Sequence, residues 1–198
     1  MAGPSEVTFQ VSTTSQQIPK FNTPPTVPKI TMNGNPFPTP SRGIPTNSSG
    51  WQLIVLDSTS DLTNPANIRV NQYFPLFASD SGYWTQTYQW TYNSIGRFLL
   101  AAGNPETQFV ILASYGWDNN APPTSFMLQQ LLNIGAGPLV QNWTMHSDAG
   151  SEVGWVSFPS AYVLIGGSSY QYGLGEEDFQ FKGNSPVTAQ ASVTVHNN

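Results

Sequence analysis

The pattern of apolar and polar positions along the chain predicts a protein built mainly from short strands. Continuous apolar runs at Trp51–Leu56 and Phe109–Ser114 are each bounded by turn-forming residues, which is typical of buried strands. In Glu6–Thr14, by contrast, apolar and polar residues alternate at every second position, which indicates a half-buried strand. Further short strands are predicted at Ile68–Tyr73, Glu152–Val156, Tyr162–Ile165, Asp178–Phe181 and Val187–Val195.

An aromatic alternation marks residues 83–92. Aromatic side chains recur at even positions of this segment, and Thr residues recur at odd positions. Because successive side chains of a strand point to opposite faces, the alternation predicts a strand with one aromatic face. The aromatic residues of this face are Trp84, Tyr88, Trp90 and Tyr92.

Two short helices are predicted between the strands. The first begins at Ser94 as its N-cap and continues to Ala102, where a following glycine ends it. The second begins at Thr124 or Ser125, carries a Leu-rich apolar stripe and ends at Gly135. Because strands predominate and the two helices are inserted among them, the predicted fold class is α+β with a largely antiparallel sheet core.

Proline is concentrated at the start of the chain, where nine of the 17 prolines precede residue 50. Proline fixes φ and lacks a backbone donor, so this part cannot form a helix or a central strand. Residues 1–48 are therefore predicted to be an extended Pro-rich arm, and residues 49–198 a β-rich globular domain. A flexible linker is the alternative interpretation of the arm.

An arm of this kind suggests contact with neighbouring subunits. The half-buried strand at its start could add to the sheet edge of another subunit, so that main-chain hydrogen bonds hold the two together. The apolar side chains predicted to make these subunit contacts are Val7, Phe9, Val11, Phe21 and Phe37.

Charge is scarce in the chain. Only 6 basic and 11 acidic residues occur among 198, whereas 6 Trp, 8 Tyr and 11 Phe are present, and this composition excludes wholesale disorder. Residues 51–198 hold three basic residues, too few for the basic surface of a nucleic-acid-binding protein. No apolar stretch reaches the length of a membrane span, so no membrane insertion is expected. The lack of cysteine excludes disulfides and cysteine metal sites.

Catalytic motifs are not found in the sequence, which lacks a nucleophile elbow, a phosphate loop and a zinc helix. One cluster combines a base, a hydroxyl and acids, His146-Ser147-Asp148 with Glu152, and it is predicted to be an exposed loop. The segment Glu176–Asp178 lacks the ligand spacing of a calcium loop and is predicted to be a solvated acidic turn. We therefore predict no catalytic residue, no metal site and no cofactor.

Two groups of side chains are candidates for carbohydrate binding, because exposed aromatic rings stack on sugar rings while amides and carboxylates bond the hydroxyls. The first is the aromatic face of residues 83–92, for which packing in the core is the alternative. The second is the polar loop that follows the strand Phe109–Ser114, for which ordinary solvent exposure is the alternative. Its residues are Trp117, Asp118, Asn119 and Asn120.

Several segments occur in a characteristic order: WQLIVLDSTS from Trp51, FVILASYG from Phe109, GAG from Gly135, AYVLIGG from Ala161 and GLGEE from Gly173. This order resembles the interleukin-like EMT inducer (ILEI, or PANDER-like) domain family over about residues 51–181. The resemblance implies a compact, sandwich-like domain of curved antiparallel sheets flanked by short helices. It implies no enzyme, and it suggests lectin-like carbohydrate binding. The disulfides of animal members are absent, which points to a microbial or viral version, and only the glycines and Ser114 are carried over, as fold markers.

The sequence as a whole favours a non-enzymatic structural or attachment subunit of a virion, phage tail or similar extracellular assembly. In this hypothesis the arm docks on neighbouring subunits, and the globular domain offers its surface to glycans. A free-standing soluble lectin is the alternative, and a hydrolase is a remote one. The first 15 residues lack the basic start and apolar stretch of a signal peptide, so classical secretion is not expected. A cytoplasmic or non-classically secreted protein is the alternative localisation.

Overall fold

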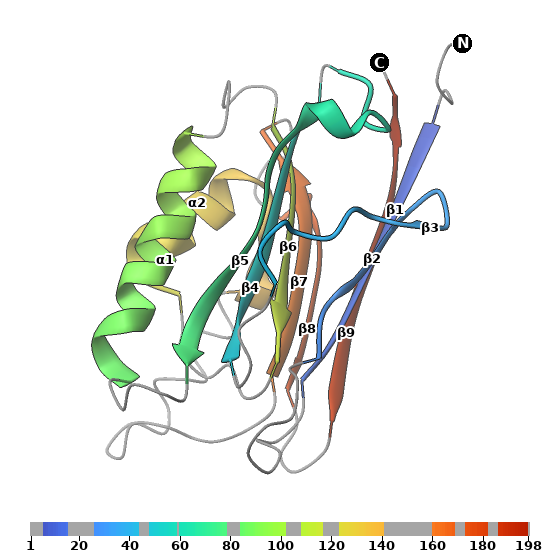
Figure 1. Cartoon of the computed structure of the whole chain (residues 1–198). Coiled ribbons are helices and arrows are strands. Elements are labelled where there is room, and N and C mark those ends of the chain that lie inside the picture. The colour runs from blue at the N-terminus through green and yellow to red at the C-terminus, as the bar shows by residue number, and fades with distance from the viewer. Residues whose placement is uncertain are drawn as a thin grey trace.

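Three layers make up the structure, a computed structural model that describes residues 6–15, 26–43, 48–58, 60–78, 84–101, 108–116, 123–140, 160–168, 173–181 and 186–197. Two helices cover one face of a five-stranded sheet, and a four-stranded sheet packs against its other face (Figure 1). All strand pairs are antiparallel. The predicted α+β class, rich in antiparallel strands and with few helices, is confirmed. No described helix is long and apolar enough to cross a membrane.

The five-stranded central sheet has the strand order β5-β4-β6-β7-β8. Its strands are β4 (Ser48–Asp57), β5 (Ile68–Ala78), β6 (Gln108–Tyr115), β7 (Ser160–Gly167) and β8 (Glu176–Phe181). The two continuous apolar runs of the sequence form β4 and β6, and all eight residues of β6 are buried. Their unbroken apolar sequence follows from their position, because both faces of these strands are covered.

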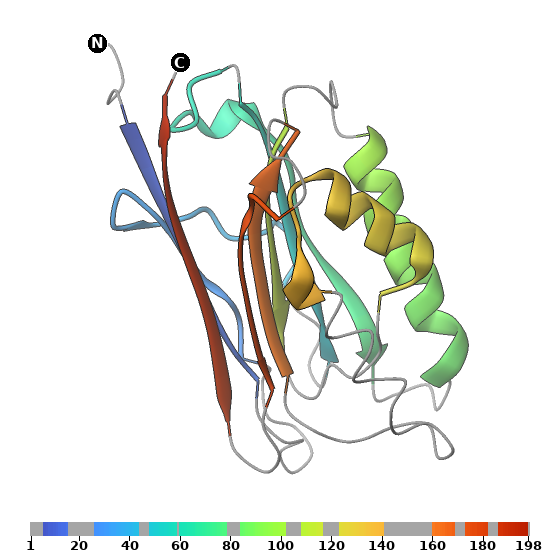
Figure 2. The same ribbon diagram turned by 180° about the vertical axis from the view of Figure 1, so that it is seen from behind.

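The four-stranded outer sheet has the order β3-β2-β1-β9. Its strands are β1 (Glu6–Ser15), β2 (Lys29–Met32), β3 (Asn35–Pro36) and β9 (Val187–His196). The first and last strands of the chain pair along their whole length, from Glu6 opposite His196 to Ser15 opposite Val187. Figure 2 shows the start of β1 and the end of β9 side by side. The alternating sequence of β1 places its apolar residues in the core and every second polar residue on the outside, while Thr13 and Ser15 lie on the inner side and are buried as well.

The helix α2 (Ser125–Asn133) forms where the sequence predicts it. Thr124 is its N-cap, and the side-chain oxygen accepts a hydrogen bond from the backbone N–H of Met127 at 3.3 Å. Just after the helix, Gly135 has a φ of 101°, a left-handed conformation that favours glycine and ends the helix. A 3-10 turn, η1 (Pro65–Asn67), precedes β5.

The predicted aromatic strand at residues 83–92 is wrong, because residues 84–92 form the first half of the helix α1 (Trp84–Ala101). Ser94, the predicted N-cap, lies in the middle of that helix. Tyr92, Ile95 and Leu99 follow one another at intervals of three and four residues, and all are buried against the central sheet. The helical period therefore places these residues on one buried stripe, and packing on the sheet overrides the local alternation.

Two hydrophobic cores lie on the two sides of the central sheet. Between the sheet and the helices, Trp51 of β4 and Leu112 of β6 pack with Met127 of α2. Between the two sheets, Ile54 of β4 and Ile111 of β6 pack with the apolar residues of the outer sheet. Successive residues of β4 and β6 thus belong to opposite cores, as the pleat of a strand requires.

The structure does not divide the chain into an arm and a domain at residue 48. The segment predicted as an arm supplies β1, β2 and β3 of the outer sheet, and β1 pairs with β9 of the same chain. The predicted subunit contacts are therefore corrected: Phe9 packs on Phe37 and on Phe109, with ring centroids 6.3 and 4.8 Å apart. The predicted contact residues that are buried in this core are Val7, Phe9, Val11 and Phe37. Phe21 lies outside the described residues.

This arrangement predicts that the first strand is essential for folding. We expect Phe9→Ala to lower the free energy of unfolding by about 3–5 kcal/mol, because it empties a fully buried aromatic site between the sheets. Gln10→Ala, on the exposed side of the same strand, is the matched control and should stay close to the wild type. Urea unfolding measures both variants. A cooperative, equally stable fold for residues 49–198 alone would contradict this assignment.

Candidate functional site

A hollow of about 290 Å³ opens where the ends of α1 and α2 meet the central sheet. This is close to the lower limit of about 300 Å³ for small-molecule sites. Both helices contribute residues from their last turns, and the sheet contributes residues at the start of β6 and just after β7. The lining residues are Leu99, Leu100, Gln108, Gln130, Asn133, Ile134 and Ser168.

Close contact between the helices shapes one side of the hollow. A Cβ atom on Gly96 of α1 would lie only 2.6 Å from the ring of Phe126 on α2, so the absence of a side chain allows the ring to lie against α1. Leu100 follows Gly96 by one turn and lines the hollow itself. Phe126 is 38% exposed and Leu100 is 52% exposed. The helix layer therefore presents an apolar surface to solvent at this place.

Two glycines at the end of β7 bring the end of α2 onto the sheet. The N–H of Gly167 donates to the carbonyl oxygen of Ile134 at 2.9 Å. Three hydrogen bonds join Ser168 and Gln108. The Ser168 N–H and the Ser168 Oγ donate to the Gln108 carbonyl at 3.0 and 3.4 Å, and the Gln108 N–H donates to the Ser168 Oγ at 2.9 Å. A Cβ on Gly166 would lie 2.0 Å from the carbonyl oxygen of Ile134. These contacts hold the sheet side of the hollow in place.

The chemistry of the hollow is neutral. Three carboxamide side chains, those of Gln108, Gln130 and Asn133, line it together with leucine and isoleucine side chains. A carboxamide carries both a donor and an acceptor, so it matches hydroxyl and amide groups of a ligand but does not select for charge. The arrangement suits an uncharged, polar ligand with an apolar surface, or a side chain of a partner protein.

The acidic segment in β8 is part of the fold and not a solvated turn, which corrects the prediction for Glu176–Asp178. The Glu177 carboxylate accepts hydrogen bonds from the backbone N–H groups of Gly137 and Leu139 at 3.0 and 3.1 Å, and from the Tyr162 hydroxyl at 2.8 Å. Burial of Tyr162 raises the pKa of its hydroxyl well above the ordinary value, and the charge and hydrogen bond of Glu177 add to this effect. Glu177 thus fastens β8 and β7 to the segment that follows α2.

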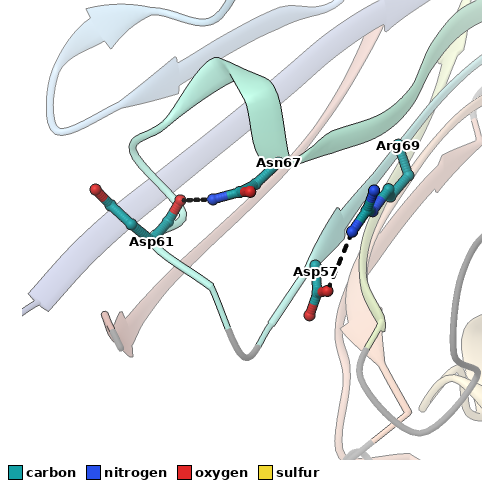
Figure 3. Close-up of polar contacts among 4 residues, drawn as sticks. All are labelled: Asp57, Asp61, Asn67 and Arg69. Atoms are coloured by element: carbon teal, nitrogen blue, oxygen red, sulfur yellow. Dashed lines mark hydrogen bonds and ion pairs between the residues drawn. The ribbon is translucent and has the colours of Figure 1, made fainter.

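A second polar cluster surrounds Asp61, beyond the end of β4. Its side-chain Oδ1 accepts hydrogen bonds from the Thr63 hydroxyl at 2.6 Å and the Thr63 N–H at 2.9 Å, and from the Asn197 amide at 3.0 Å. These hydrogen bonds lower the pKa of Asp61, and the bond from the Thr63 hydroxyl has the largest effect. Figure 3 shows that the Asn67 side chain donates to the Asp61 backbone carbonyl, at 2.8 Å. The cluster ties the end of the chain to the loop before η1.

Arg69 and Asp57 form an ion pair at 3.4 Å close to this cluster, as Figure 3 also shows. It joins neighbouring ends of β4 and β5. Within the described ranges, no group of three His, Cys, Asp or Glu residues is arranged to hold a metal ion. Both clusters near η1 are therefore accounted for by contacts within the fold.

The structure does not form the exposed aromatic face that was predicted to bind carbohydrate. Tyr92 is fully buried in the core between the helices and the central sheet, so it is no part of an exposed aromatic surface. Three further predicted residues lie in the first half of α1 and not in a strand: Trp84, Tyr88 and Trp90. The predicted loop Trp117–Asn120 and the cluster of His146, Ser147, Asp148 and Glu152 lie outside the described residues.

Sequence reasoning missed the hollow because its residues come from four separate segments of the chain. One signal was present in the sequence. Gln108 and Gln130 occupy positions where the surrounding pattern calls for apolar residues, and both are buried, with 4% and 8% of their surface exposed. A polar residue within an apolar pattern is informative, because burial of an amide is costly unless it is satisfied.

The close approach at β7 generates a prediction. In Gly166→Ala the new methyl group meets the backbone oxygen of Ile134, which cannot turn aside as a side chain could. We expect a loss of about 1–3 kcal/mol in the free energy of unfolding. Gly43→Ala is the control, since no atom lies within 4 Å of a Cβ at that position. Thermal and urea unfolding compare the two, and an equal effect of both changes would show that the approach is not tight.

Comparison with known proteins gives no indication of function. No protein-family model matches the chain, and no curated protein matches it. The likeness to the interleukin-like EMT inducer family, which rests on the order of short segments, therefore stays a prediction. What the geometry assigns is a neutral hollow with an apolar rim, on the helix layer of a protein with two antiparallel sheets.

Proposed function

We propose that this chain is a non-enzymatic structural or attachment subunit of a virion, phage tail or similar extracellular assembly. The observation that carries the proposal is the apolar surface of the helix layer, where Leu100 and Phe126 are 52% and 38% exposed beside the neutral hollow. Burial of such side chains in a contact with another subunit is favourable, since it removes apolar area from water. The hollow offers space for a side chain of that neighbour.

The low charge of the whole chain supports this role. Only 9% of the residues are charged, about a third of the usual share, so contact surfaces lose few hydrated charges when they are buried. The mode of contact differs from the one that the sequence predicted. The N-terminal strand belongs to the fold of its own chain, so the helix layer replaces the arm as the proposed docking surface.

The proposal predicts that the full-length protein associates in solution. Light scattering at several concentrations should show a mass above that of the monomer. Leu100→Lys combined with Phe126→Lys should lower this mass, because two charges would be buried without partners. Val27→Lys, at another exposed apolar residue with 45% exposure, is the matched control and should leave the mass unchanged. Circular dichroism checks that each variant is folded.

Two outcomes would contradict the proposal. A full-length protein that is monomeric at every concentration would remove the structural role. An oligomer with the same mass in the double variant and in Val27→Lys would show that the helix layer is not the docking surface.

A carbohydrate-binding role is the second candidate, and the three carboxamides of the hollow favour it. Gln108, Gln130 and Asn133 supply donors and acceptors for sugar hydroxyls, while Leu99 and Ile134 offer apolar contact to a ring. In this proposal the chain is a soluble lectin, and the hollow replaces the aromatic residues that the sequence singled out.

An array of neutral glycans tests the second candidate. Any glycan that binds should lose roughly two- to tenfold in affinity in Asn133→Ala, because the variant removes a hydrogen bond to the ligand that is worth about 0.5–1.5 kcal/mol. Gln180→Ala, an exposed amide on β8, serves as the control. Absence of any bound glycan, or equal binding by the two variants, would reject a lectin function at the hollow.

A further inference from the structure

A short sequence occurs twice in the chain, once in each of the two long strands of the outer sheet. Residues 7–14 read VTFQVSTT and residues 187–194 read VTAQASVT. The common pattern is V-T-x-Q-x-S-x-T, with eight residues in each copy. The two copies lie in β1 and β9, the first and last strands of the structure.

The pairing of the two strands places the copies about a local two-fold axis. Val11 lies opposite Ala191 near the middle of the paired segment, and these residues occupy the same position in the two copies. Thr8 consequently lies opposite Thr194, and Thr14 opposite Thr188. The hydroxyl oxygens of these threonine pairs are 2.8 and 2.9 Å apart. A rotation of 180° about the centre thus exchanges like residues.

Identity between the copies is confined almost entirely to the outer face. The four outward positions are the same in both strands, whereas three of the four inward positions differ: Phe9 corresponds to Ala189, Val11 to Ala191 and Thr13 to Val193. The core between the sheets therefore accepts different residues and does not impose the repeat. The identical residues form what we call the TQST face: Thr8, Gln10, Ser12, Thr14, Thr188, Gln190, Ser192 and Thr194.

The TQST face is exposed and carries no charge. All four of its β9 residues and Gln10 of β1 are exposed, and the remaining three are partly exposed. Charged and titratable side chains lie beside it: Lys29 of β2 is paired with Ser12, Glu6 and His196 stand at one end, and the Asp178 carboxylate of β8 accepts a hydrogen bond from the Gln190 backbone N–H at 2.9 Å. The eight side chains of the face are themselves uncharged, so they add no like-charge repulsion when two copies stack.

We propose that the TQST face is a self-association surface that packs against the same face of a second copy of this chain. Two identical subunits form an isologous contact in which the same patch serves both sides. A patch with its own two-fold symmetry offers the same hydroxyl and amide groups at both ends of that contact. The threonine and glutamine side chains of one copy supply donors and acceptors to those of the other.

The size of the face agrees with a weak contact. Two neighbouring strands, β1 and β9, form it, and at about 3.4 Å per residue and about 4.8 Å per strand they cover on the order of 300–350 Å² on each copy. The pair would bury about 650 Å², less than the roughly 1,000 Å² of a stable specific interface, so the contact is of the weak and transient class. The inference goes beyond the proposed assembly role and uses the opposite side of the molecule from the helix layer (Figures 1 and 2).

Single cysteine variants test the proposal, because the chain has no cysteine of its own. Ser192→Cys, near the centre of the TQST face, should give a cross-linked dimer with a short bismaleimide at high protein concentration. Ser125→Cys, equally exposed but at the start of α2, is the matched control. We expect roughly tenfold more dimer from the first variant than from the second, in line with a specific rather than random encounter. Equal yields would overturn the proposal.

A charge variant provides the second measurement. Gln10→Lys and Gln190→Lys are introduced together into Ser192→Cys and put positive charges at two related positions of the face. They should lower the dimer yield by about tenfold or more, since like charges then meet across the contact. Circular dichroism and the melting temperature show whether the variant is folded. An undiminished yield from a folded variant would overturn the proposal. Leu100→Lys with Phe126→Lys should leave the yield unchanged, so that failure of this contact and failure of the helix-layer contact are told apart.

Discussion

Two apolar faces on a single sheet are the constraint on which this structure depends. β4, β6 and β7 carry almost unbroken apolar sequence, so each of them exposes a hydrophobic surface on both sides unless another layer covers it. The helices α1 and α2 cover one side, and the outer sheet covers the other. Neither cover is dispensable, because leaving either face in water would forfeit the burial of a whole core, which is the main favourable contribution to folding.

The need for a second cover explains why the Pro-rich beginning of the chain is part of the domain. β1 lies between β2 and β9, and its apolar side chains reach the central sheet. Prolines are tolerated there because they lie outside β1 or at the short strand β3 on the edge of the sheet, where no ladder hydrogen bond is lost. The glycines at the end of β7 serve the other cover, since they let the end of α2 approach the sheet closely and thereby create the hollow beside it.

The same layering separates two surfaces of different chemistry. The helix layer presents apolar side chains and a hollow lined with carboxamides, which suits contacts that remove apolar area from water. The outer sheet presents hydroxyl and amide groups that repeat between β1 and β9, which suits contacts made through hydrogen bonds. Because the two surfaces lie on opposite sides of the molecule, a subunit could use both at once without mutual interference (Figure 2). Both proposed roles depend on side chains that the cores do not require.

The sequence by itself determined the strands whose pattern has a single solution: the continuous apolar runs of β4 and β6, the alternation in β1, and the capped helix α2 with Gly135 after it. It also determined the antiparallel, β-rich class. Only the tertiary structure decided that residues 84–92 are helical. The aromatic residues there alternate as in a strand, but the helix is favoured because it buries one stripe of apolar side chains against the central sheet. Tertiary packing likewise decided that Phe9 and Phe37 belong to the chain's own core, and that four distant segments form one hollow. The sequence shows that an apolar residue in an extended segment must be buried against something. Which chain or layer buries it depends on long-range pairing, which here joins β1 to a strand about 180 residues away.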